Sequence, residues 1–336
     1  MYHYTESSGY MILEPAPNIL LQANAPGLGM FMLFVSILGA PEFYLVVIPL
    51  ILWCYNKSLG VRLLLLLSIS AAINAMLKIL FHAPRPYWVS AEVKAFSSEP
   101  TFGMPSAAAQ ISLTFLGYIC TWFKKRSIWI VSIALIILVG ISRMYLGVHF
   151  LTDILSGWII ALLILLVFLR YEKPAALWLL QKPASTRILL AFLASCLFII
   201  LAQVVIYCLG AWQVPAGWSA LAFVQTNAVI DPLSPRDVLM AAGLLFGAAA
   251  GAVISAVYIP YVVDGSNSRK AIRYISGIVI LAVLWVALSA PTKSPDLAGY
   301  GMSYLRAALV GVWITAGAPF MFCRTGLANK EPDSPG

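Results

Sequence analysis

The chain has 336 residues, of which 61% are hydrophobic and 10% are charged, and its formal net charge is +8. Soluble domains carry about 25% charged residues, whereas about 20 consecutive apolar residues are enough to cross a bilayer. Such apolar stretches recur along the whole chain, so the composition excludes an ordinary soluble domain and predicts an all-α polytopic membrane protein. The positive charge does not indicate a nucleic-acid partner, because membrane proteins gather Lys and Arg in their cytoplasmic loops.

The first predicted element is an interrupted apolar stretch at residues 18–39, which contains Asn24, Pro26 and Gly27. We expect residues 1–40 to form a lead-in helix that lies at the membrane interface or is partly inserted. Nine transmembrane helices are predicted after it, at about residues 41–55, 59–81, 104–123, 127–145, 149–170, 186–210, 237–260, 271–290 and 304–323.

Two long loops interrupt this series of helices. Residues 82–103 contain two prolines and several charges, and we expect this loop to be wet or only shallowly immersed. Residues 211–236 form the long loop of the second half. Residues 324–336 are polar and are expected to be a mobile tail.

The distribution of Lys and Arg predicts the orientation of the helices. If the helices alternate in direction, 14 of the 21 Lys and Arg residues fall on one side and 7 on the other. The positive-inside rule then places the richer side in the cytoplasm. Three of the seven cations on the extracytoplasmic side belong to the motifs described next.

Three cations stand at the ends of predicted helices on this side. Lys78 lies near the end of the 59–81 helix, Arg85 follows between two prolines that stiffen the backbone, and Arg143 lies at the end of the 127–145 helix. Each could be an interfacial anchor that extends its charge to the lipid headgroups. Arg binds phosphate through a planar fork, and Lys binds it as a mobile point charge. The three cations are therefore as well suited to bind a phosphate together as to act as anchors.

A serine marks the start of the 104–123 helix, where Ser106 follows Gly103 and Pro105. The free N–H groups and the dipole at a helix N-terminus attract anions, and serine is also an ordinary N-cap. The two roles are compatible, because a bound phosphate could take over the same N–H groups.

A histidine and an aspartate, His149 and Asp153, are four residues apart and so share one face of a helix. A lone histidine on an apolar helix is commonly a core residue, but an acid one turn away and Arg143 upstream favour a chemical role. A carboxylate that accepts from one ring nitrogen fixes the tautomer and leaves the other nitrogen as a nucleophile or base. His82, between Lys78 and Arg85, is interpreted as a bystander.

These residues resemble the type 2 phosphatidic acid phosphatase (PAP2) superfamily, in its lipid-phosphate phosphatase branch. The family pattern reads K-x6-R-P, then P-S-G-H, then S-R-x5-H-x3-D. The first motif is complete from Lys78 to Pro86 and the third from Ser142 to Asp153. The resemblance covers about residues 40–170 and implies a six-helix bundle with a phosphate pocket at one membrane face.

The resemblance also divides the chain and assigns roles. Residues 41–175 would be the catalytic core, and residues 186–323 would add about four transmembrane helices of unassigned role. His149 would attack phosphorus to give a phosphohistidine, Asp153 would orient it, and neither a metal nor another cofactor would be required. The phosphate would be held by Lys78, Arg85, Ser106, Ala107 and Arg143.

The second motif departs from the family pattern at Ala108, where the family has a histidine that protonates the leaving oxygen. Alanine cannot donate a proton, and the loss of a general acid typically costs about 10²–10⁴-fold in rate. Two explanations compete: a natural pseudoenzyme that binds lipid phosphates, or an engineered, inactive form of a P-S-A-H parent. The intact state of the other phosphate positions favours the second.

The function predicted from these residues is dephosphorylation of a lipid phosphate or diphosphate at the extracytoplasmic (periplasmic) face of the inner membrane. Isoprenoid carrier diphosphates, phosphatidic acid and phosphatidylglycerol phosphate all remain open as substrates that arrive from the bilayer. A lipid phosphotransferase or a sugar-phosphate phosphatase of the same superfamily is the alternative. A transporter is disfavoured, because the last four predicted helices carry few ionisable residues. The oligomeric state is not predicted.

Overall fold

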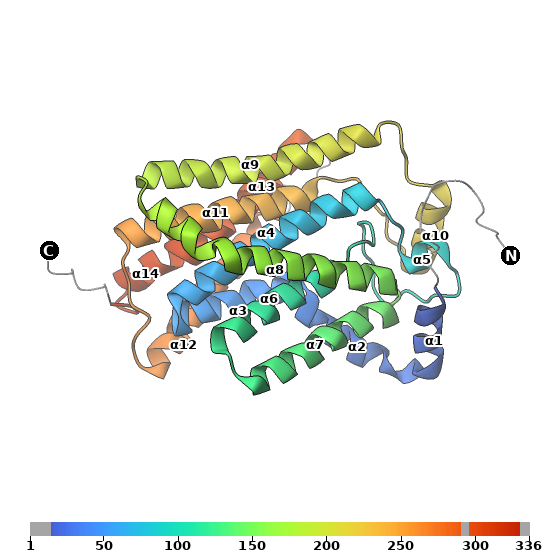
Figure 1. Ribbon diagram of the computed structural model, residues 1–336, viewed down its shortest axis with the longest axis horizontal. Helices are drawn as coiled ribbons and strands as arrows, with labels where there is room; N and C mark the ends of the chain where they lie inside the picture. The colour runs from blue at the N-terminus through green and yellow to red at the C-terminus, as the bar shows by residue number, and fades with distance from the viewer. Residues whose placement is uncertain (1–14, 290–295, 330–336) are drawn as a thin grey trace.

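The computed structural model describes residues 15–289 and 296–329, and across these ranges the protein is a bundle of helices that run along its long axis (Figure 1). The all-α membrane class is therefore confirmed. In the first half the helices are α3 (Pro41–Leu50), continued by η3 (Ile51–Tyr55), α4 (Lys57–Phe81), α6 (Ala107–Phe123), α7 (Arg126–Tyr145) and α8 (Leu151–Leu180). In the second half they are α9 (Ala184–Leu209), α11 (Arg236–Tyr258), α12 (Asn267–Ala287) and α13 (Leu297–Val312), which continues through η5 (Trp313–Gly317) into α14 (Ala318–Arg324).

Each of the nine predicted transmembrane segments contains a helix, but two of the nine are short. Seven segments in the described part of the chain are long and apolar enough to cross a membrane. Pro41–Tyr55 and Ala107–Phe123 are shorter apolar helices. The second of these starts later than predicted because Ser106 forms the N-cap of α6 after Pro105, so residues 104–106 lie outside the helix.

The N-terminal segment differs from the single lead-in helix that was expected. It forms α1 (Ala16–Asn24) and α2 (Gly29–Ser36), and the two apolar segments Ala16–Asn24 and Pro26–Gly39 meet at an angle of 90°. Pro26 lacks the N–H that would continue the hydrogen bonding of α1, and Ala25 before it leaves the helical region at φ −140°. The break lets α1 pack across the end of the bundle while α2 packs along α7.

The second half of the chain packs closely against the first through α11. This helix contacts α4 of the first half as well as α9 and α13 of the second. A Cβ added to Gly247 would lie 2.0 Å from the carbonyl oxygen of Ala308, so only glycine allows α11 and α13 to come this close. Helices in lipid gain little from the hydrophobic effect and associate through such close backbone packing.

The long loops close one end of the bundle. The 82–103 loop contains α5 (Pro86–Val89), and α10 (Ala216–Thr226) of the other long loop packs on it, at the right of Figure 1. The rings of Trp88 and Trp218 lie 6.2 Å apart, and Trp88 is buried. The aromatic part of the first loop is therefore covered by α10 and is not wet, and the shallow immersion of the loop stays a prediction.

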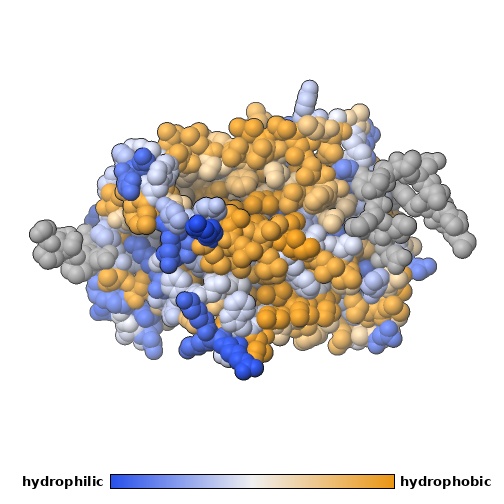
Figure 2. All heavy atoms as spheres, in the orientation of Figure 1, coloured by the Kyte–Doolittle hydropathy of each residue, from blue (hydrophilic) through white to orange (hydrophobic). Residues whose placement is uncertain are grey.

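The outer surface fits a membrane environment. In the face that Figure 2 shows, hydrophobic residues form a broad field over the middle and right, and hydrophilic residues gather mainly at the left. Many large apolar side chains of α7, α8 and α9 are exposed, including Ile130, Leu163 and Ile200. An apolar exterior of this kind is stable only in contact with lipid.

Candidate active site

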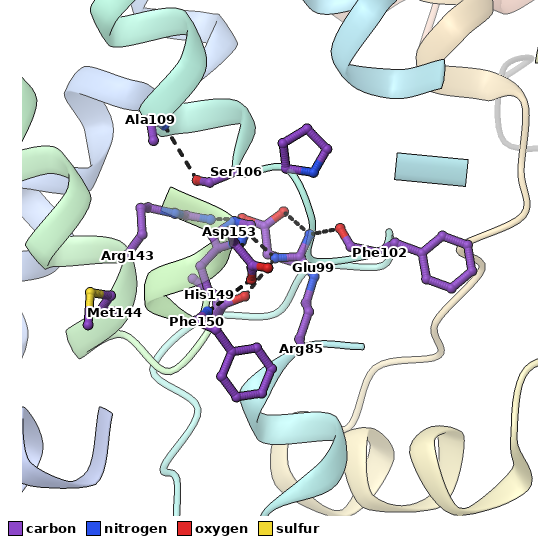
Figure 3. A network of polar contacts seen from close by, with 12 residues as sticks. Arg85, Glu99, Phe102, Ser106, Ala109, Arg143, Met144, His149, Phe150 and Asp153 are labelled. Carbon is purple, nitrogen blue, oxygen red and sulfur yellow. Dashed lines mark hydrogen bonds and ion pairs between the residues drawn. The ribbon is translucent and has the colours of Figure 1, made fainter. Parts of the chain in front are cut away.

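The predicted site residues come together at the end of the bundle that the loops close. Lys78 lies in the last turn of α4, Arg143 in the last turn of α7 and Asp153 in the first turn of α8. His149 lies on the short connection between α7 and α8, and Arg85 directly precedes α5. Figure 3 shows Arg85, Arg143 and His149 converging from these separate elements.

The imidazole of His149 is held from both sides. Its Nδ1 lies 3.3 Å from Oδ2 of Asp153, which also accepts the backbone N–H of Phe150 at 2.9 Å. Its Nε2 lies 3.2 Å from Nη1 of Arg85, which can only donate. The network therefore assigns the proton to Nδ1 and leaves the lone pair of Nε2 directed toward the cations.

The surroundings of His149 favour its neutral form. Burial lowers the pKa of the imidazole well below its usual value, and the positive charges of Arg85, Arg143 and Lys78 lower it further. The His149 side chain is 2% exposed. A neutral imidazole with an available lone pair is the form that a nitrogen nucleophile needs at neutral pH.

Arg85 organises the backbone around this histidine. Its guanidinium is fully buried and donates to the carbonyl oxygens of Val148 at 2.9 Å and Phe102 at 3.0 Å, and to the carbonyl of Thr101. Lys78 donates to the hydroxyl of Thr101 at 2.9 Å. Lys78 and Arg85 therefore both donate hydrogen bonds to the short loop segment 101–102.

Glu99 is a site residue that the sequence reasoning did not identify. Its carboxylate accepts a hydrogen bond from Arg143, and its second oxygen lies 3.9 Å from Arg85 (Figure 3). Burial by itself raises the pKa of this carboxyl, but the charges of Arg143, Arg85 and Lys78 outweigh burial and lower the pKa to about 2. An anionic carboxylate thus occupies part of the cation cluster.

The start of α6 lies against the same cluster. The side chain of Ser106 accepts the N–H of Ala109 at 3.4 Å, so the N-cap interpretation is confirmed, and its own N–H donates to the carbonyl of Asp153 at 2.9 Å. A Cβ on Gly103 would lie 2.7 Å from the carbonyl oxygen of Pro84. Only glycine therefore permits the approach of this loop to the site.

The two alanines that follow have different surroundings. Ala107 lines a cavity that Lys78 also lines. Ala108 is 6% exposed and packs with Val35 and Val139, and a Cβ on Gly39 would lie 2.5 Å from its methyl group. Helical side chains lean toward the N-terminus, so a longer side chain at this position would extend toward the end of α6 that carries Ser106.

Two further residues qualify the sequence-based predictions. Asn18 on α1 is fully buried and donates to the carbonyls of Met144 at 2.8 Å and His149 at 2.9 Å. A polar residue within an apolar stretch was the available signal for it. His82 is half-buried, ends α4 at φ +36°, and packs edge-on against Trp212, outside the hydrogen bonds of the cluster. Within residues 15–289 and 296–329, no three His, Cys, Asp or Glu side chains form a group suited to a metal ion.

Two protein-family models match separate parts of the chain. Residues 59–176 match the PAP2 superfamily model, and residues 239–330 match the model described as PAP2 superfamily phosphatase, transmembrane extension. The first segment contains all the predicted site residues, and the second contains most of the helices that had no assigned role.

Individual relatives are similar to part of the chain. A probable sphingosine-1-phosphate phosphatase of Dictyostelium discoideum is 31% identical over 144 residues, which are 38% of this chain and 34% of that protein. Phosphatidylglycerophosphatase B of Bacillus subtilis is 28% identical over 161 residues, which are 44% of this chain and 77% of that protein. The crystal structure of Aquifex aeolicus LpxE is 23% identical, covers 48% of this chain and 97% of its own, and has a TM-score of 0.42.

Proposed function

The chain belongs to the PAP2 superfamily, and from this premise we propose that it acts on a phosphorylated membrane lipid at the site formed by His149 and the three cations. The matched relatives named above are phosphatases of phosphorylated lipids. The aligned region spans about a third of the length of the Dictyostelium relative, so the activity of the whole chain is part of the proposal.

The observation that carries the proposal is the orientation of the imidazole. His149 presents the unprotonated Nε2 next to Arg85, and its Nδ1 is held by Asp153. Attack by Nε2 forms a nitrogen–phosphorus bond and breaks the bond to the lipid oxygen, and water then hydrolyses the phosphohistidine. Lys78, Arg85 and Arg143 neutralise the phosphate oxygens during both steps, and Ser106 donates a hydrogen bond to them.

The leaving lipid oxygen needs a proton, and position 108 is where the family pattern supplies it. Ala108 cannot supply a proton, which favours a second candidate function: binding of lipid phosphates without efficient turnover. The same cations serve both functions. Isoprenoid carrier diphosphates, phosphatidic acid and phosphatidylglycerol phosphate are the proposed ligands, and a lipid acceptor in place of water would give a phosphotransferase.

We expect Glu99 to compete with the substrate phosphate for Arg143. Glu99→Gln removes the negative charge while keeping the size of the side chain, so the affinity for orthovanadate should rise by about tenfold or more. This is the scale of one hydrogen bond to a charged group, about 1.5–3 kcal/mol. Isothermal titration of the purified protein in nanodiscs measures the affinity directly.

Arg143→Ala is the matched comparison for this variant, because it removes the partner that Glu99 and phosphate share. Its affinity for orthovanadate should fall by a similar factor. Weaker binding in both variants would mean that Glu99 orients Arg143 for the ligand and does not compete with it. Unchanged binding in both would remove Arg143 from the proposed phosphate site.

The proposed site lies on the extracytoplasmic face of the membrane, and labelling of single cysteines tests this. Ser98 and Lys125 are both exposed and lie in loops at opposite ends of the bundle. In a background without the five native cysteines, an impermeant maleimide should label Ser98→Cys in intact cells. It should label Lys125→Cys only after permeabilisation. The reverse pattern would place the chemistry on the cytoplasmic side.

A further inference from the structure

A cavity connects the candidate site with the second half of the chain. Its volume is about 230 Å³, and its wall combines helices α3, α4 and α6 of the first half with α11, α12 and α13 of the second. The matched transmembrane extension therefore supplies about half of the helices around it. The catalytic motifs all lie outside this extension, so they give it no role in the proposed chemistry.

The lining of this cavity is mostly apolar, with charge at one place. Leu67, Leu244 and Val310 are typical of the wall, whereas Lys78 and Asp237 are its two charged residues. Lys78 is also one of the three cations of the candidate site. Asp237 lies in the first turn of α11, where its exposed side chain lines the cavity. The charges of Lys78 and Asp237 interact electrostatically.

A space with this polarity matches one kind of molecule. A lipid phosphate has an anionic head and a long apolar chain, and the cavity has a cation of the phosphate site and a mostly apolar wall. An apolar cavity that is merely a packing gap has no reason to include a lysine that belongs to the catalytic cluster. A hydrocarbon chain bound there would remove its own apolar surface from water and make dispersion contacts with the wall.

We infer that this cavity binds the hydrocarbon chain of the lipid phosphate, and that α11 and α13 of the extension form its selecting wall. The inference rests on the proposed function, because the phosphate must lie at Lys78 for the chain to enter the space beside it. Small residues on the extension side, Ala241 and Ala307, leave room for the chain. Larger residues at these two positions would shorten the chain that fits.

The test compares ligands that share a phosphate and differ in chain length. Orthovanadate, butyl phosphate and hexadecyl phosphate are titrated into the purified protein in nanodiscs, for the parent and for Ala241→Leu and Ala307→Leu. Hexadecyl phosphate should bind about tenfold more weakly to both variants, the effect of displacing roughly two buried methylenes. Orthovanadate and butyl phosphate should bind as they do to the parent.

A control variant and a second measurement protect the result against misfolding. Ala249→Leu adds the same group to the same helix at a position that does not line the cavity, and it should leave all three affinities unchanged. In the unmodified protein, hexadecyl phosphate with a diazirine at its chain end should crosslink to α11 or α13. Crosslinks confined to the outer surface of the bundle would overturn the inference.

The remaining outcomes separate this inference from the function on which it rests. If the two cavity variants lose butyl phosphate and hexadecyl phosphate equally while remaining folded, the cavity does not hold the chain. If the parent binds neither orthovanadate nor butyl phosphate, the proposed phosphate site itself fails, and the chain site fails with it.

Discussion

Ala108→His is expected to raise the release of phosphate from lipid phosphates by at least about 10²-fold, the lower end of the effect of a general acid. The helix start that carries position 108 adjoins the cluster formed by Ser106, Asp153 and His149. A histidine there would lean toward this end of α6 and could protonate the lipid oxygen as it leaves. Phosphate release from a panel of lipid phosphates and diphosphates measures the gain.

The matched control is Ala108→Gln, which has a similar size but no acidic proton to donate. Both variants must accommodate a larger side chain beside Gly39 and Val139, so comparable thermal stability would show that packing is not the cause of a difference. Equal activity of the two variants would argue against proton donation at this position. A folded Ala108→His protein that binds every lipid phosphate tested and hydrolyses none would establish binding without turnover as the function.

His149→Ala in the Ala108→His protein is expected to abolish turnover, because no other group in the cluster combines an available lone pair with contact to the cations. Arg85 and Lys78 can only donate, and the Glu99 carboxylate is held by Arg143. Loss of a covalent nucleophile removes the reaction path itself and does not merely weaken one interaction. The same lipid panel measures the loss.

A chemical readout distinguishes a nucleophile from a residue that only supports the fold. Rapid quenching of the Ala108→His protein with a labelled lipid phosphate should trap an acid-labile phosphoryl group on the protein, and His149→Ala should prevent it. Orthovanadate binding should survive in His149→Ala, because the three cations remain. Trapped phosphate in that variant would assign the nucleophile to another residue.

Much of the fold could be predicted because the signals for it are local. Apolar runs of about 20 residues mark the membrane spans, and the orientation inferred from the Lys and Arg bias stays a prediction. The boundaries were less predictable. Pro26 divides the lead-in segment into two helices at 90°, and N-capping by Ser106 shortens α6, so each depends on the conformation of single residues.

The site motifs were also predictable, because each is defined by short spacings. His149 and Asp153 are one helical turn apart, and Lys78 and Arg85 flank a helix end, so neither pair needs knowledge of distant contacts. The structure brings these pairs together as expected. It also shows that Arg85 donates hydrogen bonds mainly to backbone carbonyl groups, and the spacing of residues in the sequence could not indicate this.

Sequence by itself determined the class of the protein, the order of its spans and the residues of the cation cluster, because these follow from composition and from neighbours within a few positions. Only the tertiary structure decided what surrounds that cluster. Asn18 reaches the carbonyl of His149 across 131 positions, and Asp237 and Lys78 line one cavity from opposite halves of the chain. Contacts of this kind depend on how helices pack, and helix packing is set by the shapes of whole surfaces and not by any local pattern.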